Sequence, residues 1–114
     1  MENLPAQTGK GYDMKLSHLE KESIKKDLAA CFADEPEVRK VVVFGSFVTA
    51  ENPNDLDVAV FQDSNEPYLP LAMKYRRKTR LLARRIPLDI LPLKVGPTGI
   101  MLDEIARGDV IYEK

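Results

Sequence analysis

Apolar residues recur along the chain in two patterns that predict different elements. Apolar positions three or four residues apart predict amphipathic helices over about 17–33 and 68–85. Short runs of β-branched and aromatic residues predict strands over about 39–44, 55–62 and 87–93. Helices that alternate with strands in this way predict an α/β (α+β) fold.

The two ends of the chain carry their own signals. Residues 1–15 contain two glycines and a proline without any apolar period, so we expect a flexible N-terminal arm before a single domain over 16–114. Ser17, followed three residues later by Glu20, matches a capping box that starts the first helix. Near the C-terminus, a short helix is expected from about 97 to 105, ended by Gly108 in a left-handed conformation. Residues 110–112 are expected to return along the sheet or to pack on its edge.

Gly45 and Ser46 directly follow the first predicted strand. Glycine lets the backbone turn sharply and approach a ligand, while amide groups and a serine hydroxyl can bind phosphate oxygens. A Gly-Ser pair is also a common feature of ordinary turns, so this pair alone does not decide between the two.

Asp55 and Asp57 stand at the head of the second predicted strand. Alternate residues of a strand point to one face, so these carboxylates project together, with their Cα atoms roughly 7 Å apart. They repel each other unless a cation lies between them, and hard oxygen ligands suit magnesium or manganese. The alternative is a solvated strand edge with two surface acids.

Asp89 is the only charged residue in the apolar run 86–93, which we expect to be largely buried. A buried carboxylate needs a cation or hydrogen-bond donors. The alternative is a turn or capping aspartate between Pro87 and Pro92.

Together, Gly45-Ser46, Asp55-x-Asp57 and Asp89 resemble the motif of the nucleotidyltransferase superfamily that includes DNA polymerase beta. More closely, the chain resembles the minimal nucleotidyltransferases (MNT), single-domain proteins often paired with a helical HEPN partner as antitoxin and toxin. The resemblance runs from about residue 17 to the C-terminus, and it implies a small mixed β-sheet with helices packed against it.

The resemblance also implies a function. The expected reaction is magnesium-dependent transfer of a nucleoside monophosphate, AMP from ATP, to a hydroxyl on a partner macromolecule, a HEPN-type toxin that the transfer neutralises. Asp55, Asp57 and Asp89 would form the catalytic set and hold two Mg²⁺ ions, while Gly45 and Ser46 would bind the nucleotide. Superfamily members that modify small molecules carry an extra helical domain for the acceptor, so in a chain of 114 residues we expect the acceptor on another molecule.

Two other functions stay open. The family commonly has a basic residue after Gly-Ser, whereas this chain has Phe47, Val48, Thr49 and Ala50 there. A non-catalytic toxin-binding module with a weak or vestigial nucleotide site is therefore the second hypothesis. Transfer of nucleotides onto an RNA end is the third, and salt-sensitive RNA binding would be its mark.

The composition narrows the classes of protein further. An apolar content of 44% and a charged content of 31% are typical of a globular domain, and neither a membrane-spanning run nor a signal peptide is visible. We therefore expect a cytoplasmic protein with no membrane partner. The single Cys31 cannot form an internal disulfide, and we expect it to be a buried thiol. The single His18 has no second histidine or cysteine with which to build a zinc site, and we expect it to be an exposed residue at the start of the first helix.

The net charge of −1 hides a strong segregation of charge. The segment 71–86 has seven basic residues and no acid, which leaves ten basic and eighteen acidic residues, or −8, for the rest. This basic helix is either a solvated face that balances the acidic remainder or a binding surface. We favour an acidic protein as its partner over nucleic acid, because Tyr75 falls on the apolar stripe and base stacking is not indicated. Nucleotide phosphates are a further alternative, and self-association stays open.

Overall fold

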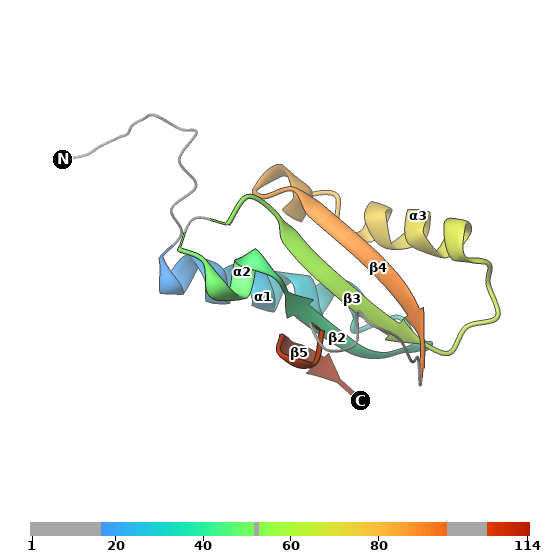
Figure 1. Ribbon diagram of the computed structural model, residues 1–114. Coiled ribbons are helices and arrows are strands. Elements are labelled where there is room, and N and C mark those ends of the chain that lie inside the picture. Colours follow the sequence, from blue (N-terminus) through green and yellow to red (C-terminus); the bar gives the residue numbers. More distant parts are fainter. Residues whose placement is uncertain (1–16, 52, 96–104) are drawn as a thin grey trace.

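A four-stranded mixed sheet with helices on one side forms the body of the protein (Figure 1). The computed structural model describes residues 17–51, 53–95 and 105–114. In chain order the elements are α1 (His18–Phe32), β2 (Val38–Phe44), α2 (Ser46–Thr49), β3 (Leu56–Gln62), α3 (Tyr68–Lys78), the 3-10 helix η1 (Leu82–Arg84), β4 (Leu88–Lys94) and β5 (Asp109–Glu113).

The strands lie in the order β4-β3-β2-β5. β2 pairs antiparallel with both β3 and β5, whereas β3 and β4 are parallel and are joined through α3. A parallel connection needs such a crossover, because two parallel strands cannot be joined by a tight hairpin. The sheet is therefore mixed, and the predicted α/β (α+β) class is confirmed.

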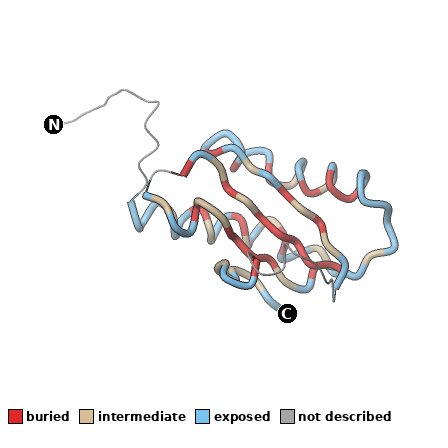
Figure 2. Tube along the Cα trace, in the orientation of Figure 1, coloured by how far each residue is buried: buried red, intermediate tan, exposed pale blue. Residues whose placement is uncertain are grey.

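The two faces of the sheet are covered differently. On the face that α1 and α3 cover, buried side chains form the helix-side core. Its largest contributors include Ile24, Leu28 and Phe32 from α1, Leu71 and Tyr75 from α3, and Val41, Val43, Val58, Val60 and Ile90 from the strands. The opposite face, called the open face here because α1 and α3 do not pack on it, carries a smaller cluster made of Val42, Phe44, Ala59, Phe61 and Ile105. Because both faces bury apolar side chains, the middle strands are buried almost continuously (Figure 2).

The first helix begins as its sequence predicts. The Ser17 hydroxyl accepts a hydrogen bond from the Glu20 amide at 3.1 Å, and the Glu20 carboxylate accepts one from the Ser17 amide at 2.9 Å. This reciprocal capping box satisfies two amide groups that the first turn of a helix leaves unpaired. His18 is exposed at the start of α1, as expected, whereas Cys31 is half-buried rather than buried.

The predicted helix over 68–85 is wrong in its extent, because α3 ends at Lys78. The backbone leaves the helical conformation at Thr79, whose φ is −104° and ψ is 14°, and the buried Thr79 hydroxyl donates a hydrogen bond to the Tyr75 carbonyl at 3.0 Å. The chain then turns through η1 and delivers β4 beside β3.

The prediction that Gly108 adopts a left-handed conformation is wrong, because its φ does not lie in that region. A Cβ atom at this position would lie 2.5 Å from the Val43 carbonyl oxygen. Gly108 is therefore required by the close approach of two backbones at the start of β5.

Some predictions fall outside the described residues. These are the flexible arm over 1–15 and most of the helix expected from about 97 to 105. Residues 110–112 do return along the sheet, as part of β5. None of the helices in the described part of the chain has the length and apolarity needed to cross a membrane.

Candidate nucleotide and metal site

The parallel pairing of β3 with β4 places two of the predicted carboxylates side by side. Asp57 is the second residue of β3 and Asp89 the second residue of β4, and the register pairs them directly. Val58 and Ile90, one residue further along, lie in the helix-side core. Since side chains alternate along a strand, both carboxylates project from the opposite, open face of the sheet.

Asp55 lies just before β3, two residues from Asp57. A hydrogen bond of 2.9 Å from the Leu56 amide to the Pro87 carbonyl fixes the start of β3 against the segment that leads into β4. The three aspartates therefore share one end of the sheet, where both parallel strands begin. They differ in exposure, because Asp55 and Asp57 are half-buried whereas Asp89 is exposed.

The expectation that the stretch around Asp89 is largely buried is therefore wrong at Asp89 itself. β4 is an edge strand of the sheet, and its neighbouring residue Ile90 is only 3% exposed because it packs into the helix-side core. Asp89 takes the other face, where solvent reaches the beginning of the strand. An exposed carboxylate here is accessible to a ligand from outside the chain.

Gly45 packs directly against the central carboxylate. It follows Phe44, which pairs with Asp57 across β2 and β3, and its φ of 77° and ψ of −150° belong to a region that is almost confined to glycine. A Cβ atom at Gly45 would lie 2.5 Å from the Asp57 carboxylate oxygen Oδ2. Gly45 thus has two roles: its backbone conformation allows the turn after β2, and its lack of a side chain lets the backbone lie close to the Asp57 carboxylate.

Ser46 begins the short helix α2, which the sequence predicted only as a loop. Phe47, the next residue, is 2% exposed and anchors α2 in the helix-side core. Phe47 therefore anchors the turn that follows β2.

Lys21 is a supporting residue that the sequence reasoning missed. Its Nζ donates a hydrogen bond of 2.6 Å to the Ala50 carbonyl, just after α2, and lies 5.5 Å from the centre of the Phe47 ring. The contact joins positions 29 residues apart, so no local pattern in the sequence could have indicated it.

The donor set fits a magnesium site in ligand type and in strand register. Carboxylate oxygens are the ligands that Mg²⁺ prefers, and two of them come from residues paired across neighbouring strands. Within residues 17–51, 53–95 and 105–114, however, no three acidic, histidine or cysteine side chains converge closely enough to hold a metal ion. Mutual repulsion keeps like charges apart until a cation neutralises them.

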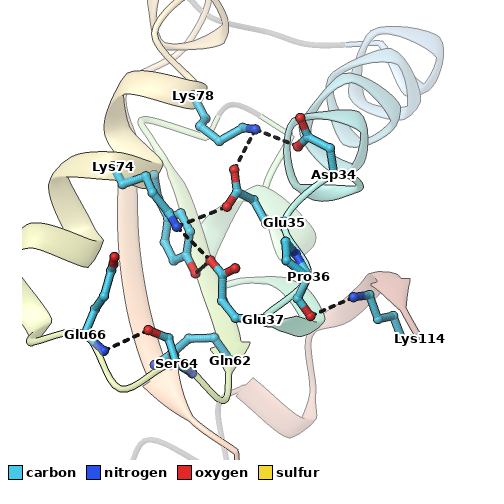
Figure 3. Close-up of polar contacts among 11 residues, drawn as sticks. Asp34, Glu35, Pro36, Glu37, Gln62, Ser64, Glu66, Lys74, Lys78 and Lys114 are labelled. Atoms are coloured by element: carbon cyan, nitrogen blue, oxygen red, sulfur yellow. Dashed lines mark hydrogen bonds and ion pairs between the residues drawn. The ribbon is translucent and has the colours of Figure 1, made fainter.

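A second polar cluster lies away from these aspartates and joins α3 to the segment after α1 (Figure 3). Lys74 contacts Glu35 at 3.1 Å and Glu37 at 3.0 Å, and Lys78 contacts Glu35 at 2.8 Å. The Tyr75 hydroxyl donates a hydrogen bond of 2.8 Å to the Glu37 carboxylate. Part of the basic helix is therefore balanced by acids within the chain.

These contacts shift the titration of the groups involved. Burial alone would raise the pKa of Glu37, but hydrogen bonds from its own backbone, Lys74 and Tyr75 outweigh burial and lower this pKa. Burial, together with the hydrogen bond to the Glu37 carboxylate, raises the pKa of Tyr75 well above its usual range. The cluster thus keeps an ionised carboxylate next to a neutral phenol.

Comparison with known proteins identifies the family. The family model described as "Polymerase beta, Nucleotidyltransferase" matches residues 26–114, which include Gly45, Ser46 and all three aspartates. The fold is similar to a chain of the solved complex described as tri-AMPylated Shewanella oneidensis HEPN toxin with MNT antitoxin. That match has a TM-score of 0.57 and 16% sequence identity, and it covers 82% of this chain and 73% of the other.

At that identity the structural likeness shows the fold alone. No curated protein has a significantly similar sequence. The family match extends over most of the chain and contains every predicted site residue. The chain therefore belongs to the polymerase beta nucleotidyltransferase family.

Proposed function

We propose that this protein is a magnesium-dependent nucleotidyltransferase that transfers AMP from ATP to a hydroxyl on a partner protein, a HEPN-type toxin, and so acts as its antitoxin. The observation that carries the proposal is the pairing of Asp57 with Asp89 across the parallel strands β3 and β4, with Gly45 against Asp57. Membership of the nucleotidyltransferase family supports the reaction class. The structural neighbour belongs to a complex of a tri-AMPylated HEPN toxin with MNT antitoxin, which supports the choice of nucleotide and partner.

In this proposal Asp55, Asp57 and Asp89 hold two Mg²⁺ ions, and Gly45 and Ser46 bind the terminal phosphates through backbone amides and the serine hydroxyl. When bound, magnesium supplies positive charge that neutralises the triphosphate and stabilises the pyrophosphate leaving group. Gly45 keeps the phosphate-binding turn close to Asp57, because no side chain separates them.

The reaction is an in-line displacement at the α-phosphorus. The acceptor oxygen forms a bond to this phosphorus while the bond to the bridging oxygen of the β-phosphate breaks, so that pyrophosphate leaves with that oxygen. Asp89 takes the proton from the acceptor hydroxyl, as a general base at the exposed edge of the site. Most of the catalytic effect in such chemistry comes from positioning and charge neutralisation.

The exposure of Asp89 favours an acceptor that is part of another macromolecule. Asp89 lies on an edge strand and is open to solvent, so a loop or helix of a partner can bring a hydroxyl to it. A tyrosine hydroxyl fits this geometry because the ring holds the oxygen well away from the partner's backbone.

The test is transfer of label from α-labelled ATP to protein, with magnesium and a lysate of the source organism. The comparison is between the wild type, Asp57→Asn, and Asp63→Asn as a matched control just beyond the other end of β3. We expect one labelled protein band with the wild type and with Asp63→Asn, and none with Asp57→Asn. Loss of transfer in both variants, persistence in Asp57→Asn, or label on RNA instead of protein would contradict the proposal.

A non-catalytic toxin-binding module is the second candidate, because the chain has no basic residue between Ser46 and Asp55. It predicts partner binding without magnesium-dependent ATP binding. Calorimetry with ATP in the presence and absence of magnesium separates the two functions.

A further inference from the structure

The cations of the basic segment divide into two groups with different partners. Lys74 and Lys78 contact Glu35, Glu37 and Asp34, and thereby tie α3 to the rest of the fold. Arg85 pairs with Asp27 at 3.1 Å. The lysines are therefore structural, which accounts for part of the charge segregation seen in the sequence.

Four arginines form the second group: Arg76, Arg77, Arg80 and Arg84. Their side chains are exposed, and none makes an ion pair or hydrogen bond with the described residues of the chain. Asp34, Glu35 and Glu37 are already paired with the lysines, and Asp27 is paired with Arg85. The positive charge of these arginines is thus directed to solvent and is not balanced locally.

Apolar side chains are exposed beside these arginines. Leu69, Met73 and Leu81 are 62%, 49% and 73% exposed. Leu69, Met73 and Arg76 follow one another at helical spacing, so they share one face of α3. The surface is mixed in character, with arginine and flexible aliphatic side chains together.

Two hollows shape this surface. One has a volume of about 610 Å³ between α1 and the corner from α3 to η1, and its lining includes Cys31, Arg77, Arg80 and Leu81. The other has a volume of about 340 Å³ and is lined by Met73, Arg76, Arg77 and Arg80. Arg77 and Arg80 line both, so they lie at the centre of the combined surface.

We propose that this arginine surface, made of Leu69, Met73, Arg76, Arg77, Arg80 and Leu81, binds an acidic amphipathic helix of the partner protein. Charge complementarity selects an acidic ligand, since the arginines have no acidic partners within the described chain. Exposed leucine and methionine side chains select a protein over a nucleic acid, because arginine and methionine are enriched at protein interfaces. Tyr75, in the middle of α3, is fully buried and offers no ring for base stacking.

The surface is separate from the three aspartates. α3 packs on the helix side of the sheet, whereas Asp57 and Asp89 project from the open face. A partner can therefore dock on α3 without covering the site that carries the nucleotide. The inference rests on the proposed function only in identifying the bound helix with the protein that receives the nucleotide.

The test measures fluorescence anisotropy of a labelled synthetic peptide of about 20 residues, long enough for a stable helix, with glutamates and leucines at helical spacing. Its probes for comparison are a scrambled peptide of the same composition and a uridine RNA of similar length. The proteins are the full chain, Arg77→Glu, Arg80→Glu, and Lys26→Glu as a control with the same charge change at an exposed position of α1. Circular dichroism melts confirm that each variant is folded.

We expect the wild type to bind the amphipathic peptide more tightly than the scrambled peptide or the RNA. Reversal of one central charge at Arg77 or Arg80 should weaken peptide binding roughly tenfold or more, and Lys26→Glu should leave it unchanged. Equal binding of both peptides, preference for RNA, or equal loss in Lys26→Glu would overturn the proposal.

Calorimetry with magnesium and ATP on the same proteins keeps the two proposals apart. Peptide binding without magnesium-dependent ATP binding would refute the proposed nucleotidyltransferase activity and would still support the arginine surface as a binding site. If the protein binds ATP and transfers the nucleotide but does not bind the peptide, only the proposal for the arginine surface is refuted.

Discussion

Replacing Gly45 by alanine puts a methyl group into the contact between the Gly-Ser turn and the central carboxylate. The added Cβ would lie 2.5 Å from Asp57 Oδ2, closer than real Cβ contacts. To restore normal contact, the Asp57 carboxylate would have to shift by about 0.5 Å or more from its present position. The backbone, with φ of 77° and ψ of −150°, cannot change without displacing α2.

The two effects have different magnitudes and different readouts. An alanine in a backbone region almost confined to glycine costs about 1–3 kcal/mol of unfolding free energy. For 114 residues a loss of about 2 kcal/mol lowers Tm by roughly 8 °C. Displacement of Asp57 acts on function instead, since misplacement by about 1 Å in a reacting constellation can cost on the order of 100-fold in rate.

The assay pairs thermal melting with nucleotide transfer at a temperature where every variant is folded. Gly108→Ala is the matched control, because a Cβ there would meet the Val43 carbonyl oxygen at 2.5 Å and would destabilise the contact between β5 and β2 without meeting Asp57. We expect both variants to melt at lower temperature, while only Gly45→Ala loses transfer per folded molecule. Unchanged transfer in Gly45→Ala, or equal loss in both variants, would refute the role given to this contact.

Three further predictions concern the stability of the fold. Tyr75→Phe removes the 2.8 Å hydrogen bond to the Glu37 carboxylate and should lower the free energy of unfolding in urea by about 1.5–3 kcal/mol. In a Glu37→Gln background the same substitution should cost only about 0.5–1.5 kcal/mol, because the acceptor is then a neutral amide oxygen. Because the pKa of Glu37 is lowered in the folded state, its contribution is present above the ordinary value of 4.5 and is lost as pH falls through the folded pKa. Urea midpoints of the wild type should therefore drop more steeply in acid than those of Glu37→Gln, and parallel curves would contradict this. Leu28→Ala, at a position with no exposed surface, should cost about 2–5 kcal/mol, and a loss below 1 kcal/mol would show that the helix-side core is looser than the structure indicates.

Local patterns were enough to predict most of the elements. The capping box at Ser17 and the β-branched run before Gly45 depend on near neighbours, and both agree with the structure. The end of α3 was not foreseen, because Thr79 fits the helical spacing and the change of its backbone conformation has no local signal in the sequence.

The site was predictable as a set of residues but not as an arrangement. The sequence placed Asp57 at the head of one strand and Asp89 on a later strand, whereas their direct pairing depends on the parallel register of β3 with β4. Long-range pairing of this kind has no local signal. The same holds for Lys21, which supports α2 from a distant helix, and for the arginines, which only the structure separates from the paired lysines.

The central claim, that Asp57 and Asp89 form one magnesium-dependent nucleotide site across two parallel strands, is tested most directly by calorimetric titration of ATP. The titration compares the wild type, Asp57→Asn, Asp89→Asn and the control Asp63→Asn, each with and without magnesium. The account predicts magnesium-dependent binding by the wild type and Asp63→Asn, and its loss in both other variants. Binding that does not depend on magnesium, or that survives both site substitutions, would contradict it.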